Sequence, residues 1–176
     1  MLAPALESSF NYKDALSCAM ERLATDQRVL FLGQGVRDKG TFMSTTLENV
    51  PPEKRIELPV AEEMQLGMSI GLALAGYVPV SVFPRWNFLI LAANQLVNHL
   101  DKMGGRVIVR VGVGSSKPLD PGDQHKGDYT EAFRQMMPNT YIKKLERASD
   151  IISEYRAALH RDGPSVLVEV ADLYAS

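Results

Sequence analysis

The stretch Glu57-Leu58-Pro59-Val60-Ala61-Glu62 runs directly into an apolar, glycine-punctuated segment at residues 63–76. Pro59 restricts the residue before it to extended backbone and suits the start of a helix, so the chain passes from strand to helix here. The segment is too weakly polar for a surface helix, and a buried carboxylate is costly unless something uses it. We therefore expect Glu62 to be buried at the start of this helix, within a functional site.

A second stretch places aromatic side chains immediately after the next predicted strand. The apolar run at residues 78–82 leads into Phe83-Pro84-Arg85-Trp86-Asn87-Phe88. An acid and an aromatic platform at the ends of neighbouring strands indicate a site for a flat, nitrogen-containing ring. Arg85 has two open interpretations: it reaches the carboxylate of a substrate, since arginine forms bidentate pairs with carboxylates, or it serves at a surface or interface.

Strands and helices alternate along the whole chain. Apolar or β-branched runs predict strands at residues 28–32, 55–58, 77–83, 106–113, 140–145 and 165–170. Helical patterns predict helices at residues 12–25, 61–75, 87–103, 129–137 and 150–161. This alternation predicts a three-layer α/β/α fold with a mostly parallel sheet, in which ligands bind beyond the carboxyl ends of the strands. No linker divides the sequence, so we expect one domain over residues 1–176, with residues 1–11 as an N-terminal tail.

The bulk composition excludes several classes of protein. The chain has 176 residues, of which 45% are hydrophobic and 23% charged, and its formal net charge is -2. This charge offers no electrostatic case for nucleic acid or an anionic membrane as partner. The apolar stretches are too short for a membrane span, no signal peptide is evident, and the single cysteine, Cys18, cannot form an intrachain disulfide. We therefore expect a cytoplasmic protein with a small-molecule substrate.

Taken together, the motifs of this chain carry a family resemblance. They are the stretch 57–62, Gly67, Gly71, residues 75–76, 79–80, 87–88 and 94–95, and Asn98. Residues 29–36 add a strand followed by Gly-Gln-Gly-Val, and residues 162–166 with Glu169 add a downstream match. This pattern resembles the pyrimidine-binding domain of thiamine-diphosphate enzymes, in particular the beta subunit of the decarboxylating component of 2-oxo acid dehydrogenase complexes. The resemblance covers roughly residues 12–174 and implies a fold of the same type.

The resemblance implies a cofactor, thiamine diphosphate, and roles for two residues. In this family the glutamate that matches Glu62 hydrogen-bonds a ring nitrogen of the cofactor's aminopyrimidine, and it thereby promotes removal of the proton from the thiazolium carbon. Phe88 matches the position whose ring stacks on the aminopyrimidine, a contact that contributes about 1 kcal/mol beyond its area burial. We therefore expect Glu62 to be catalytic and cofactor-binding, and Phe88 to be cofactor-binding.

Three further residues are candidates at the same strand ends. Gly33 and Gln34 follow the first predicted strand, and we expect both to bind the cofactor. Gln34 stands where the family has an acid. His125 falls near a family loop in which a histidine faces the substrate, so we expect it to be catalytic. Lys126 and Gly127 replace the serine and glutamine of that loop, which weakens the match.

The family's diphosphate and magnesium motif, Gly-Asp-Gly followed by an asparagine, is not found in the sequence, where Gly122-Asp123-Gln124 is only a partial echo. We therefore predict no metal ligands in this chain. The sequence ends at Ser176 without the C-terminal domain of the beta subunits. The resemblance then implies a split enzyme, in which a partner chain binds the diphosphate and Mg²⁺. We expect a homodimer or a heterotetramer, with the apolar helix at residues 87–100 at the interface.

Three functions remain open at this point. The first is a subunit of a thiamine-diphosphate enzyme that cleaves or transfers at the carbonyl of a 2-oxo acid or ketose, as in 2-oxo acid dehydrogenases and transketolases. The second is a non-catalytic, degenerate domain that binds or regulates a partner, which the replacements at Gln34, Gly35, Lys126 and Gly127 favour. The third is a generic nucleotide-binding α/β protein, which no Gly-x-Gly-x-x-Gly or Walker loop supports.

Overall fold

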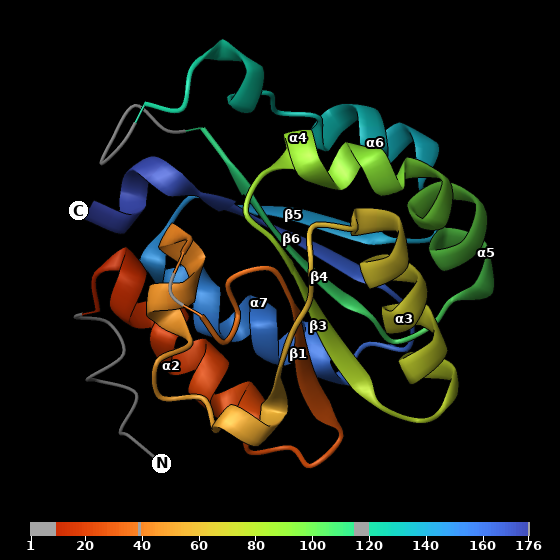
Figure 1. Cartoon of the computed structure of the whole chain (residues 1–176), viewed down its shortest axis with the longest axis horizontal. Coiled ribbons are helices and arrows are strands. Elements are labelled where there is room, and N and C mark those ends of the chain that lie inside the picture. The colour runs from red at the N-terminus through yellow and green to blue at the C-terminus, as the bar shows by residue number, and fades with distance from the viewer. Residues whose placement is uncertain (1–9, 39, 115–119, 176) are drawn as a thin grey trace.

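A computed structural model describes residues 10–38, 40–114 and 120–175. Within these residues, six strands form a parallel sheet in the order β2-β1-β3-β4-β6-β5, and helices cover both of its faces (Figure 1). The predicted α/β fold with helices on both sides of a mostly parallel sheet is confirmed. Of the predicted N-terminal tail, residues 1–9 lie outside the described part of the chain.

The strands and helices lie close to the ranges predicted from the sequence. The strands are β1 (Val29–Gly33), β2 (Arg55–Glu57), β3 (Val78–Phe83), β4 (Ile108–Val113), β5 (Tyr141–Leu145) and β6 (Ser165–Val170). The α-helices are α2 (Tyr12–Ala24), α3 (Glu62–Leu74), α4 (Trp86–Leu89), α5 (Asp101–Met103), α6 (Thr130–Met136) and α7 (Ala148–His160). Short 3-10 helices are η1 (Phe42–Thr46), η2 (Pro52–Lys54), η3 (Ile90–Ala92), η5 (Asp123–His125) and η6 (Ala171–Ala175). No helix in the described ranges is both long and apolar enough to cross a membrane.

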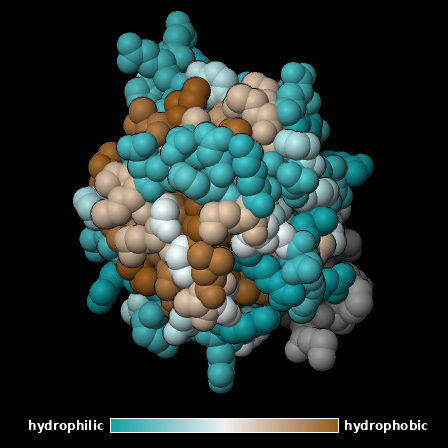
Figure 2. Space-filling model, turned by 90° about the vertical axis from the view of Figure 1, so that its right-hand side faces the viewer, coloured by the Kyte–Doolittle hydropathy of each residue, from teal (hydrophilic) through white to brown (hydrophobic). Residues whose placement is uncertain are grey.

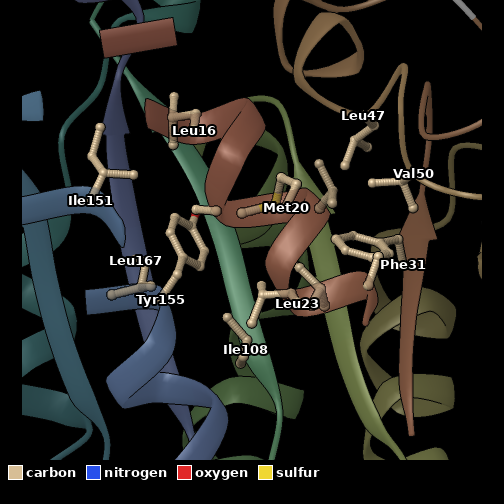
Figure 3. Packing of buried hydrophobic residues seen from close by; sticks show 14 of the residues in the cluster. Leu16, Met20, Leu23, Phe31, Leu47, Val50, Ile108, Ile151, Tyr155 and Leu167 are labelled. Carbon is tan, nitrogen blue, oxygen red and sulfur yellow. The ribbon is translucent and has the colours of Figure 1, made fainter. Parts of the chain in front are cut away.

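Two apolar cores separate the sheet from its helical layers. Helices α2 and α7 pack together on one face, and α3, α4 and α6 lie on the other (Figure 1). The residues labelled in the first core are Leu16, Met20, Leu23, Phe31, Leu47, Val50, Ile108, Ile151, Tyr155 and Leu167 (Figure 3). Every residue of β3 and β4 is buried, because both faces of these central strands are covered. The continuous apolar runs in the sequence have this physical cause.

The predicted helix at residues 87–103 is wrong as one continuous α-helix. The chain instead passes through α4, η3, a π-helical segment η4 (Gln95–Leu100) and α5. A π-helical turn takes up more residues than an α-helical turn, so it changes which side chains face the sheet. Leu96 and Leu100 are fully buried, whereas Leu91 is 60% exposed. The apolar residues of this helical segment therefore divide into two groups. One group packs in the core, and the other lies exposed at the protein surface.

A buried ion pair joins β4 and β6, two neighbouring strands inside the sheet. Arg110 on β4 donates from Nε to Oε1 of Glu169 on β6 at 2.5 Å, and from Nη2 to Oε2 at 3.0 Å. Both side chains are 0% exposed. The hydroxyls of Tyr155 and Tyr174 also donate to Glu169, and Thr46 accepts from Arg110 at 2.7 Å. Burial, followed by the charge of Glu169, raises the pKa of both tyrosines well above the ordinary value, so they remain donors.

We expect Arg110→Met to destabilise the chain by about 3–5 kcal/mol, because it leaves the Glu169 carboxylate buried without its cation. The double variant Arg110→Met/Glu169→Leu should recover part of this loss, since no buried charge remains unpaired. Urea denaturation measures both. Arg106→Met is the control, because its ion pair with Asp162 joins side chains that are 41% and 95% exposed. A loss below about 1 kcal/mol for Arg110→Met would contradict the assigned importance of the pair.

Candidate functional site

The carboxyl ends of three neighbouring strands meet at one edge of the sheet. Gly33, the last residue of β1, pairs with Glu57 at the end of β2 and with Val82 near the end of β3. The connections that leave these strands therefore start side by side. A pocket lies between them, and its lining residues are Gln34, Pro59, Val60, Ala61, Glu62, Gln65, Val82, Phe83, Pro84 and Phe88. The two stretches singled out in the sequence thus line one pocket, together with the residue that follows β1.

Glu62 is the first residue of α3 and lines this pocket. Its side chain is half-buried, so the expectation of a fully buried carboxylate is corrected. The buried residues of α3 begin one turn later, with Gln65 and Leu66, so the start of the helix lies outside the core. No hydrogen bond or ion pair engages the Glu62 carboxylate within the described residues. The positive end of the helix dipole favours a negative charge there.

Gln65 fastens the first turn of α3 to the strand ends. Its side chain is 3% exposed. Its Nε2 donates to the carbonyl of Val82 at 2.9 Å, to Oγ of Ser81 at 3.0 Å and to the carbonyl of Leu32 at 3.4 Å. These acceptors lie on β1 and β3, so one amide ties the helix to two strands. Glu62, three residues earlier, is one turn away on the same side of the helix and takes its position from this attachment.

Gly33 lies beneath the pocket and does not line it. Its φ is +149°, which glycine adopts readily and other residues do not. A Cβ at this position would lie 2.4 Å from the carbonyl oxygen of Val82 and 3.1 Å from Nε2 of Gln65. The absence of a side chain therefore lets the Gln65 amide reach its acceptors. Gln34, the next residue, is exposed and lines the pocket.

Phe88 and His125 form a contact at the rim of the pocket. Phe88 belongs to α4, immediately after the end of β3, and lines the pocket. The rings of Phe88 and His125 meet edge to face, with 5.4 Å between centroids and an interplanar angle of 66°. Both side chains are half-buried. The structure therefore brings Gln34, Glu62 and Phe88 to one pocket, with His125 adjacent through its contact with Phe88.

Glu57 organises the loop that carries Gln34. It ends β2 and accepts hydrogen bonds from the backbone N–H groups of Gly35 at 2.5 Å, Arg37 at 2.7 Å and Asp38 at 3.2 Å. Burial acts to raise the pKa of Glu57, but these backbone donors outweigh it and leave the pKa below its usual value. The ionised carboxylate thus holds the turn after β1 in place.

Sequence reasoning did not assign these roles to Gln65 and Glu57. For Gln65 a signal was present, because a single amide side chain in an otherwise apolar helix needs a buried partner. Its partners on β1 and β3 are 16 to 33 residues away, and no local pattern indicates them. Glu57 begins the stretch at residues 57–62, but its hydrogen-bond donors belong to a loop about 20 residues earlier in the chain. No local pattern around Glu57 indicates them.

The sheet order and the pocket at its carboxyl edge define an α/β ligand-binding domain whose acid comes from the start of a helix and whose aromatic ring follows the next strand. The family described as "Transketolase, pyrimidine binding domain" matches residues 8–175. The chain therefore belongs to the transketolase pyrimidine-binding domain family. The resemblance stated from the sequence is confirmed.

Curated relatives are beta subunits of 2-oxo acid dehydrogenases. The chain is 29% identical over 177 residues to the mitochondrial pyruvate dehydrogenase E1 component subunit beta of Caenorhabditis elegans. The aligned region covers 95% of this chain and 50% of that relative. It is 26% identical over 174 residues to the 2-oxoisovalerate dehydrogenase subunit beta of Bacillus subtilis, covering 92% of this chain and 52% of the relative. The chain thus spans about half the length of these relatives.

Solved structures share the fold. A split gene transketolase, described as an inactive beta4 tetramer, superposes with a TM-score of 0.74 at 18% identity, covering 92% of this chain and 51% of that one. A transketolase from Campylobacter jejuni superposes with a TM-score of 0.71 at 19% identity, covering 90% of this chain and 25% of that one. At these identities the comparison supports the fold alone.

We expect Gly33→Ala to destabilise the chain by at least about 1–3 kcal/mol from backbone strain alone. The new Cβ also displaces the Val82 carbonyl or the Gln65 amide. Gly67→Ala is the matched control: no heavy atom lies within 4 Å of its added Cβ, and it should stabilise the isolated chain by about 0.5–1 kcal/mol. Urea denaturation compares the two. Equal stability of Gly33→Ala and the unaltered chain would rule out the assigned close approach.

Proposed function

We propose that this chain is the pyrimidine-domain subunit of a thiamine-diphosphate enzyme that acts at the carbonyl of a 2-oxo acid or a ketose. Its active site would be completed by a partner chain that binds the diphosphate and Mg²⁺. Family membership supports the cofactor class. The single observation that carries the proposal is the pocket at the sheet edge, lined by both the carboxylate of Glu62 and the ring of Phe88.

The carboxylate, amide and aromatic ring at the pocket have the chemistry that binding an aminopyrimidine ring requires. Glu62 has a carboxylate that is free to share a proton with a ring nitrogen, since no group of the described residues engages it. The start of α3 and the Gln65 attachment fix where that carboxylate lies. Phe88 offers a ring face or edge against which a flat heterocycle packs. Gln34 supplies an exposed amide at the same pocket.

Thiamine diphosphate supplies an electron sink that holds the carbanion after C–C cleavage at a carbonyl. Glu62 would bind and orient the ring, and it would hold or release the proton at the ring nitrogen. His125, in contact with Phe88, would face the substrate side of the pocket and move a proton there.

An apolar face next to the pocket suits a partner chain. The exposed side of α3 carries Met64 and Met68, which are 44% and 38% exposed, with Gly67 and Gly71 between and beside them. Among the described residues, and apart from the backbone of α3 itself, no heavy atom lies within 4 Å of a Cβ built on either glycine. Figure 2 shows apolar side chains gathered on the side of the molecule that carries α3. The glycines allow a second backbone to approach closely, and Leu91 extends the face.

We expect Glu62→Gln to lower kcat about 100-fold or more, because an amide cannot accept or return the ring proton. The assay uses the chain with its partner, thiamine diphosphate and Mg²⁺, and follows turnover of 2-oxo acids and ketoses. Glu63→Gln is the control, since this neighbouring carboxylate is exposed and does not line the pocket. Full turnover in Glu62→Gln would remove Glu62 from the chemistry. No turnover of the unaltered assembly with any substrate would favour a non-catalytic, partner-binding domain.

We expect Gly67→Leu to weaken assembly with the partner chain at least about tenfold, a loss of roughly 1.4 kcal/mol, because the side chain fills the space reserved for the partner's backbone. The isolated chain should keep its stability, since nothing lies within 4 Å of that position. Sedimentation velocity and titration calorimetry measure the assembly. Ser153→Leu on α7, an exposed position across the sheet, is the matched control. Equal affinities for both variants would place the partner elsewhere.

A further inference from the structure

Arg85 is buried although it carries a charge. It directly precedes α4 and is 9% exposed. Its Nη1 donates to the carbonyl of Gly114 at 2.6 Å and to the carbonyl of His125 at 3.4 Å. Its guanidinium carbon lies 5.6 Å from the centroid of the Phe42 ring. Arg85 does not line the pocket, and its guanidinium instead bonds two backbone carbonyls beside it.

Asn87 holds the same segment two residues further along. Its Oδ1 accepts from the backbone N–H of Gly127 at 3.1 Å, and its Nδ2 donates to the hydroxyl of Tyr129 at 3.4 Å. Phe88 adds the ring contact with His125. The side chains of Arg85, Asn87 and Phe88 therefore all contact the short stretch of chain at residues 125–129.

Among the described residues, the other hydrogen bonds and ion pairs of the stretch Asp120–Gly127 lie inside the stretch itself. Asp120 pairs with Lys126 at 2.7 Å and accepts from the N–H of Gly122 at 2.9 Å, but these contacts lie within the segment and are largely exposed. Exposed ion pairs contribute little. The His125 Nδ1 is buried and has no hydrogen-bond partner in the described structure. The imidazole is therefore placed by its backbone and by Phe88, and not by a polar contact of its own.

We propose that Arg85 and Asn87 are positioning residues that fasten the segment Asp120–Gly127 to α4 and thereby hold the His125 imidazole against Phe88 at the rim of the pocket. Arg85 holds the carbonyl of His125, and Asn87 holds the amide of Gly127. The attachment itself is independent of the activity. Its consequence for catalysis rests on the proposed function.

Limited trypsin digestion of the full chain tests the attachment, because trypsin cleaves after Lys126 only when the surrounding segment leaves the protein surface. We expect Arg85→Met and Asn87→Leu each to accelerate cleavage after Lys126 about tenfold or more, with the cut identified by mass spectrometry. Cleavage after Lys143, within β5, should stay unchanged and reports on global unfolding. Arg85→Lys should recover part of the protection from trypsin, since the lysine ammonium can still donate to the backbone carbonyls that Arg85 bonds. Arg106→Met is the control and should match the unaltered chain.

Hydrogen exchange at the amide of Gly127 gives a second readout that does not depend on Arg85. Asn87→Leu should accelerate this exchange, and Arg106→Met should not. If Arg85→Met accelerates cleavage after Lys126 and Lys143 together, the variant has unfolded globally. The exchange rate of the Gly127 amide in Asn87→Leu then decides whether the attachment exists. Cleavage after Lys126 and exchange at Gly127 within twofold of the unaltered chain in Asn87→Leu would overturn the proposal.

The reconstituted enzyme tests the consequence for catalysis. Arg85→Met should lower kcat and leave the substrate KM within about threefold, and it should add nothing further to the loss caused by His125→Ala. Independent, multiplying losses in the double variant would overturn the role of Arg85 through His125. An unaltered assembly without turnover contradicts the proposed function instead, and in that case the digestion and exchange results still decide whether the attachment exists.

Discussion

The ion pair of Arg110 and Glu169 is the interaction on which the rest of the fold depends. Burying two charges is costly, and hydrogen bonds to the pair offset that cost, although Nη1 of Arg110 has no partner among the described residues. Thr46, Tyr155 and Tyr174 supply such partners from η1, α7 and η6. The pair therefore sets the position of three elements relative to β4 and β6, and a shift of any one of them would leave a buried polar group without its contact.

The same constraint reaches the pocket through Gly112. This glycine lies two residues after Arg110 on β4 and is paired with Glu169 across the strands. A Cβ on it would lie 2.3 Å from the carbonyl oxygen of Pro84 and 2.7 Å from Cζ of Phe42. The connection from β3 to α4 therefore crosses directly over β4. The close approach at Gly112 limits how far this connection, which leads into α4 and Phe88, can lie from the sheet.

The pocket at the sheet edge lies beside an exposed helix face. Glu62 and Phe88 approach the pocket from two strand ends, and the exposed face of α3 continues beside it without cover. Two glycines inside α3 each cost about 1 kcal/mol of helix propensity. Packing of a second chain against Gly67 and Gly71 would offset that cost. Helix α3 is bonded to the sheet by Gln65 on its inner side and is exposed on its outer side. The proposed second subunit would pack against that outer side.

The sequence by itself determined the alternation of strands and helices, the strand-to-helix turn at Pro59, and the presence of an acid and an aromatic ring after two successive strands of the chain, because period and composition are local properties that report burial directly. The prediction that these two strands are neighbours in the sheet is wrong, since β1 lies between β2 and β3. Only the tertiary structure decided the strand order, which places β1 between β2 and β3, the π-helical turn at η4, and the hydrogen-bond partners of Arg110, Gln65 and Arg85. Each of these depends on groups brought together from distant parts of the chain, and hydrogen-bond partners of buried polar side chains leave no periodic trace in the sequence around them.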